Sequence, residues 1–185
     1  MGNRNRSRKQ SAMMAFCGLS AALSVVLMFS GGLIPIATYC VPMMCGILLL
    51  PILIEYGKKM AWTMFAAVSL ITLLIGIDKE AAFFYLFLGY YPILKWEIER
   101  IKNKPVRLIA KLAVFNVSII VMYTVLGVLL NMDALIEEFT QMGWWLLSAF
   151  MVLLNVCLLL YDRLLVPMVF LYVNRIRPKL RFLRG

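Results

Sequence analysis

The chain has 185 residues, of which 63% are hydrophobic and 15% are charged, and its mean hydropathy is +0.89. Soluble domains are usually about 45–50% apolar and about 25% charged, so this composition excludes a soluble single domain, intrinsic disorder and a disulfide scaffold. What remains is an all-α polytopic membrane protein, in which the excess of 19 Lys and Arg over 9 Asp and Glu indicates basic cytoplasmic loops rather than nucleic-acid binding.

Long apolar runs predict the elements, because a spanning helix needs about 20 mostly apolar residues. The six runs cover residues 11–30, 34–54, 60–77, 81–93, 108–130 and 143–173. We expect Pro42 and Pro51 to kink the second span. The fourth run is short, and we expect it to tilt or to continue as an interfacial helix through residues 95–100.

The charges of alternate loops predict the orientation. The N-terminus, residues 58–59, residues 95–107 and the tail from residue 175 hold nearly all the positive charge, whereas the intervening loops hold one lysine and five acids. A bundle of six transmembrane helices with both termini cytoplasmic satisfies the positive-inside rule at every loop. We therefore expect a basic cytoplasmic N-terminus (1–10), a transmembrane domain (11–173) and a basic cytoplasmic tail (174–185).

Polar residues inside the apolar runs are the first functional candidates, since such groups are costly in a bilayer. Asn116 and Asn155 indicate either an interhelical hydrogen bond or a contact with a ligand. Asp162 and Arg163 interrupt the last run near the cytoplasmic interface. They predict either an interfacial ion pair or a contact surface for another subunit.

A second set of candidates lies toward the outer face. Aromatic and polar groups that converge at the mouth of a bundle can form a ligand pocket. The proposed substrate-binding residues are Thr38, Tyr39, Tyr85, Tyr123 and Asn155. The alternative is that the outer aromatic residues form an interfacial belt and that the turn at residues 78–80 is simply solvated.

Small residues recur four apart along the first span, for example at Gly18 and Ala22. Such stripes let helix backbones approach closely. They indicate that this helix is a packing face, either for another helix of the chain or for a second subunit.

The residues that the chain lacks exclude several kinds of catalytic and metal site. The chain has no histidine, which excludes His-based acid–base catalysis and His-ligated metals. The four cysteines form no CxxC pair and are expected to be small buried side chains. No cluster of buried acids is evident in the runs, so we expect no enzymatic activity, no metal and no cofactor.

The combined pattern resembles a known family. A basic start precedes a first span rich in alanine at residues 12–15 and 21–22, a Pro-bearing second span and the polar turn at residues 55–59. The string at residues 88–92 then leads into Lys95. This is similar to the substrate-binding S components of energy-coupling factor (ECF) transporters and to related small membrane proteins of Gram-positive bacteria.

The resemblance implies a fold, partners and site residues. S components are six-helix bundles in the plasma membrane that capture a vitamin or metal ion from outside and associate with a transmembrane coupling subunit and cytoplasmic ATPases. By this resemblance the positions that contact the coupling subunit would be Ala15, Gly18 and Ala22, although the strict Ala-x-x-x-Ala form is absent. The loop with Gly31, Gly32 and Pro35 would gate the pocket.

A scaffold of the rod-shape-determining type is the alternative, because those cell-wall proteins have a similar length and span count. A scaffold needs membrane lipid and lateral surfaces, such as the Gly18 stripe and the region of Asp162 and Arg163, but no ligand. Transport predicts an outer cavity lined by residues such as Thr38, Tyr85, Tyr123 and Asn155, whereas a scaffold predicts solid packing there.

Overall fold

The structure is a computed structural model that describes residues 2–31, 37–75, 78–129 and 143–179. Within these ranges every regular element is a helix, and no strand is present. Five segments are long and apolar enough to cross a membrane: Gln10–Gly31, Thr38–Tyr56, Lys58–Ile75, Lys104–Gly127 and Trp144–Ile176. The prediction of an all-helical fold is therefore confirmed for the described residues, and several of its helices are compatible with a membrane bundle.

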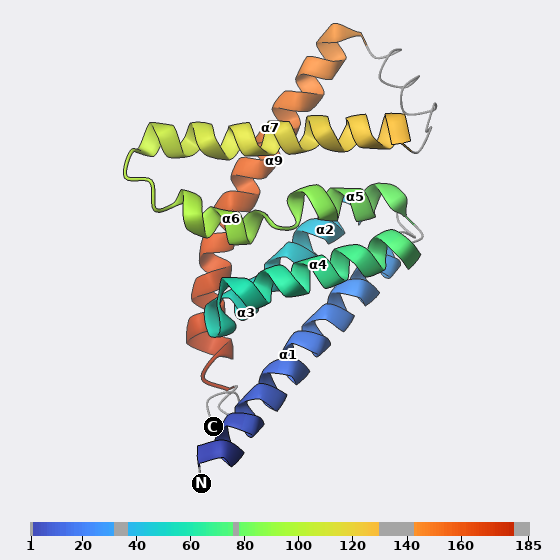
Figure 1. Cartoon of the computed structure of the whole chain (residues 1–185). Helices are drawn as coiled ribbons and strands as arrows, with labels where there is room; N and C mark the ends of the chain where they lie inside the picture. The colour runs from blue at the N-terminus through green and yellow to red at the C-terminus, as the bar shows by residue number, and fades with distance from the viewer. Residues whose placement is uncertain (1, 32–36, 76–77, 130–142, 180–185) are drawn as a thin grey trace. The chain divides into compact units, whose positions relative to one another are not determined.

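The chain divides into two compact units, which are coloured by residue number in Figure 1. Unit 1 comprises residues 1–93 and 165–185, and unit 2 comprises residues 94–164. The predicted gate residues Gly32 and Pro35 and the acidic loop at residues 131–141 lie outside the described residues.

Unit 1 is built from the helices of the first half of the chain. These are α1 (Gly2–Gly31), α2 (Ala37–Ile47), α3 (Leu49–Tyr56), α4 (Lys58–Ile75) and α5 (Lys79–Leu88). Helix α1 packs against α2 and α4, α2 packs against α5, and α3 packs against α4 (Figure 1). Their shared core includes the fully buried Cys45, Leu49, Ile52, Val68 and Tyr85.

Proline breaks the second predicted span as expected. Helix α2 ends at Ile47 and α3 begins at Leu49, with Leu48 in the turn between them. Pro51 has no N–H to donate to the carbonyl of Ile47, so the α-helical ladder cannot continue there without a defect. Because Pro51 falls in the first turn of α3, the new helix loses no hydrogen bond.

The fourth predicted span differs from the structure. It was expected to run to residue 93 and to tilt or to continue as a helix through residues 95–100. Instead α5 ends at Leu88, and the continuation is a separate helix, α6 (Tyr91–Ile98). Pro92 cannot donate to the carbonyl of Leu88, which accounts for the break. The ring of Tyr85 also lies against Gly89, where a Cβ atom would come within 2.5 Å of the ring.

The contact between α1 and α2 depends on a glycine. A Cβ atom at Gly31 would lie 2.7 Å from Cγ2 of Val41. Nearby, the thiol of the buried Cys45 lies 3.4 Å from the carbonyl oxygen of Ser24. Of the other cysteines, Cys17 is half-buried while Cys40 and Cys157 are exposed, so the expectation that all four are buried is wrong for the last two.

Unit 2 contains the second part of α6, helix α7 (Lys104–Leu129) and the first part of α9 (Trp144–Leu171), up to residue 164. Helix α7 buries one face, made of Lys111, Phe115, Ser118, Ile119, Met122 and Leu126. The last seven residues of α9 (165–171) belong to unit 1, and a short π-helical turn, η1 (Tyr172–Ile176), follows them. Trp144 and Trp145 at the start of α9 are almost fully exposed, as an interfacial aromatic belt requires.

Candidate functional site

Unit 2 contains a cluster of four charged side chains, centred on Asp162 of α9. The ammonium of Lys95 lies 2.9 Å from Oδ1 of Asp162, and that of Lys111 lies 2.7 Å from Oδ2. Lys95 also donates to the backbone carbonyl of Asp162. Glu99 completes the cluster, with its Oε1 3.5 Å from Lys95 and 3.7 Å from Lys111.

Three of the four side chains in this cluster are largely shielded from solvent. The side chains of Lys95, Lys111 and Asp162 are only 9%, 7% and 15% exposed, respectively. Charges removed from water are stable only when they are paired and hydrogen-bonded, and here each carboxylate oxygen of Asp162 faces a different ammonium. The predicted ion pair at Asp162 is therefore confirmed.

Sequence reasoning missed Lys111, because it was treated as part of an apolar run. A signal was present: Lys104, Arg107 and Lys111 follow one another at spacings of three and four. This spacing places all three on one face of a helix. The sequence therefore predicts a basic stripe, made of these three residues, at the start of a membrane helix. It does not predict that this stripe contacts Asp162 on α9.

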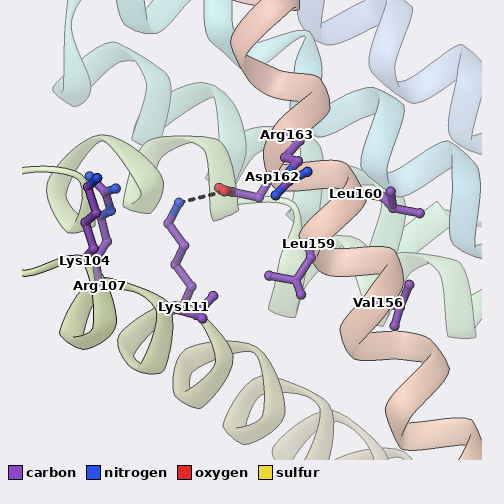
Figure 2. A pocket seen from close by; sticks show the side chains of 9 residues that line it. Lys104, Arg107, Lys111, Val156, Leu159, Leu160, Asp162 and Arg163 are labelled. Atoms are coloured by element: carbon purple, nitrogen blue, oxygen red, sulfur yellow. Dashed lines mark hydrogen bonds and ion pairs between the residues drawn. The ribbon is translucent and has the colours of Figure 1, made fainter.

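This basic stripe forms one wall of a pocket of about 470 Å³ between α7 and α9. Figure 2 shows Lys104, Arg107 and Lys111 extending from α7, while Asp162 and Arg163 extend from α9. The rest of the lining is apolar and consists of Leu108, Val156, Leu159 and Leu160. The pocket is thus cationic at one end and apolar at the other.

An amide pair holds α7 and α9 together deeper in the same unit. The Nδ2 of Asn116 donates to Oδ1 of Asn155 at 2.9 Å, and the Nδ2 of Asn155 donates back to Oδ1 of Asn116 at 3.1 Å. Each Nδ2 also donates to a carbonyl of its own helix. The predicted interhelical hydrogen bond is confirmed, and it occupies the donors of Asn155.

The polar residues predicted at the outer mouth make contacts within unit 1. The hydroxyl of Thr38 donates to Oδ2 of Asp78 at 2.8 Å, and that of Tyr39 donates to Oε1 of Glu80 at 2.8 Å. Asp78 also caps α5 by accepting from the N–H of Ala81. The turn is therefore bonded to α2 and is not simply solvated.

The five proposed substrate-binding residues do not all fall in one unit. Thr38 and Tyr39 lie beside the start of α5, and Tyr85 is fully buried in the core of unit 1 against Phe65. Tyr123 and Asn155 belong to unit 2. A pocket lined by all five stays a prediction.

The predicted coupling residues of α1 share one surface. Ala15, Gly18 and Ala22 are all exposed, and a Cβ atom at Gly18 would meet no other atom within 4 Å. Gly31, one of the three predicted gate residues, is buried against Val41, and the gate stays a prediction. The exposed face of α1 is thus separate from the face that packs inside unit 1.

Comparison of the chain with protein-family models, with curated proteins and with solved structures finds no match. In the described ranges, no three cysteine or acidic side chains come close enough to hold a metal ion. The candidate functional features of the chain are therefore the buried charge cluster at Asp162, the cationic pocket between α7 and α9, and the exposed face of α1.

Proposed function

We propose that the chain is a six-span integral membrane protein with both termini in the cytoplasm. Contacts inside unit 1 support the alternation of cytoplasmic and outer loops along the chain. Glu55, at the end of α3, forms an ion pair with Arg177, with Oε1 2.7 Å from Nε, and accepts a hydrogen bond from the hydroxyl of Tyr172 at 3.4 Å. These contacts join the C-terminal tail to the loop after the second span, and both ends are basic, as cytoplasmic segments are.

Cysteine labelling tests this topology. In a chain whose native cysteines are replaced by alanine, Lys58→Cys and Lys102→Cys should react with an impermeant maleimide only after the membrane is opened. Gly143→Cys should react in intact cells. Labelling of residues 58 and 102 from opposite sides would contradict the six-span arrangement.

For the function, we propose a substrate-binding subunit of an ECF-type uptake transporter for a small, vitamin-like solute. The observation that supports it is the exposed face of α1 with Ala15, Gly18 and Ala22. Exposed small residues let a second helix approach the backbone closely, which a coupling subunit requires. Gly18 is the centre of this face because it leaves the most room.

Co-expression with a coupling subunit and its ATPases tests the proposal. We expect a detergent-stable complex with the wild-type chain and its loss with Gly18→Leu. Ala149→Leu, at an exposed position of α9, is the matched control and should leave the complex intact. A complex that survives Gly18→Leu, or that never forms, would contradict the coupling role.

A non-transporting scaffold of the cell-wall type is the second candidate, and a specific observation favours it. The hydroxyls of Thr38 and Tyr39 donate hydrogen bonds to Asp78 and Glu80, whereas a transporter would direct these hydroxyls at its cargo. Native mass spectrometry of the gently extracted protein separates the two functions. A retained solute with ATPases favours transport, and wall-synthesis proteins without a solute favour the scaffold.

A further inference from the structure

We propose that the pocket between α7 and α9 binds the headgroup of an anionic phospholipid, with the lipid's glycerol and upper acyl chain along its apolar wall. This inference concerns unit 2 alone, and it holds whether the protein transports a solute or acts as a scaffold.

The charge of the pocket is unbalanced. Its one acid, Asp162, is already paired with the ammonium groups of Lys95 and Lys111. Lys104, Arg107 and Arg163 also line the pocket, and none of them forms an ion pair with a carboxylate in the described part of the chain. Three uncompensated cations around one cavity favour an anion with several oxygen acceptors, and arginine is well suited to phosphate.

The size and the apolar lining of the pocket make a purely polar ligand a poor fit. The volume of about 470 Å³ falls within the range of roughly 300–1,000 Å³ that ligand sites occupy. Leu108, Val156, Leu159 and Leu160 supply an apolar wall that an inorganic anion would leave uncovered. An amphiphile with a charged head and an apolar body uses both halves of the cavity.

The position fits the membrane interface. Lys104 is the first residue of α7, and Lys111 lies seven residues further on, a rise of about 10 Å. Figure 2 shows the ammonium of Lys111 directed at Asp162, while Lys104 and Arg107 lie nearer the start of α7. Basic pockets between membrane helices on the cytoplasmic side are typical sites for anionic headgroups.

Native mass spectrometry from lipid nanodiscs tests the site. In discs with equal amounts of phosphatidylglycerol and phosphatidylcholine, we expect the wild-type chain to retain phosphatidylglycerol preferentially. Arg107→Gln and Arg163→Gln should each weaken this retention by about fivefold, the effect of one basic group at an anionic surface. Both side chains lie outside the buried ion cluster, so size-exclusion profiles should stay unchanged.

The control is Lys102→Gln, which removes a positive charge two residues before α7 without touching the pocket. We expect less than about a twofold change, because exposed charges are screened by salt. An equal loss with Lys102→Gln, or equal retention of both lipids by the wild-type chain, would overturn the proposal.

A further arm separates a lipid from free phosphate. Val156→Asn makes the apolar wall polar and should weaken retention of phosphatidylglycerol. Inorganic phosphate, added to the detergent-solubilised chain, should not protect it against heating. Phosphate protection that is insensitive to Val156→Asn, without lipid enrichment, would assign the pocket to an inorganic anion and overturn the lipid assignment.

Discussion

Replacing Asp162 by asparagine tests whether the buried charge cluster holds unit 2 together. The substitution keeps the shape of the side chain but removes the charge that faces Lys95 and Lys111 at 2.9 and 2.7 Å. Both lysine side chains are more than nine-tenths buried, so neither ammonium can recover its hydration in place. Their remaining carboxylate is Glu99, which is 44% exposed and at 3.5 Å or more.

The expected cost follows from the geometry. Breaking a buried ion pair by removing one partner typically costs about 3–5 kcal/mol, because an uncompensated charge stays behind. We expect Asp162→Asn to fall near the lower end, at about 3 kcal/mol, since Lys95 keeps its bond to the backbone carbonyl. Glu99→Gln removes a half-exposed partner and should cost about 1 kcal/mol or less.

The assay is reversible unfolding of the purified chain in mixed micelles with increasing SDS, followed by circular dichroism. A triple variant, Lys95→Met, Lys111→Met and Asp162→Leu, controls for a failure to fold, because an apolar replacement of a buried cluster is often neutral or stabilising. If Asp162→Asn lowered the free energy of unfolding no more than Glu99→Gln, the cluster would not be a buried structural element.

Three further predictions concern contacts that a single substitution can test by the same unfolding assay. Gly31→Ala should cost about 1–3 kcal/mol, because its methyl group would overlap Val41, and Val41→Ala should restore most of the loss; no rescue would contradict the close α1–α2 contact. Asn116→Leu and Asn155→Leu should each lower the free energy of unfolding by about 1–2 kcal/mol, because each leaves the partner amide without its hydrogen bond. The double variant should lose less than the sum of the two. Strict additivity would rule out the reciprocal pair. Asp78→Ala should cost about 1–3 kcal/mol through the lost α5 cap and the lost bond to α2, while Asp78→Asn should keep most of the stability; equal losses would exclude capping.

Local sequence information accounts for the helices and most of their ends. Apolar runs specify where a chain can cross a bilayer, because the cost of burying backbone groups in lipid leaves the helix as the available solution. Pro51 locates the break between α2 and α3 through its missing donor, and it was predicted. Pro92 acts in the same way between α5 and α6, where the sequence predicted that the short fourth run would tilt or continue and the structure has two separate helices.

Pairings between distant residues required the tertiary structure. The sequence showed Asp162 in an apolar run and predicted an ion pair, but it could not select Lys95 and Lys111, which lie 67 and 51 residues away. In the same way, it marked the small-residue stripe with Gly18 on the first span and placed Gly31 in the following loop, without showing that Gly31 packs inside unit 1 while Gly18 stays exposed.

The sequence by itself therefore determined the class of protein, its helical content and the charge of its loops, since these depend on composition and on spacing along one element. The tertiary structure decided which charges neutralise one another, which cations stay unpaired beside a cavity and which face of α1 is open. The physical reason is that helix formation is satisfied within each segment, whereas the partner of a buried charge or a glycine is supplied by a different helix.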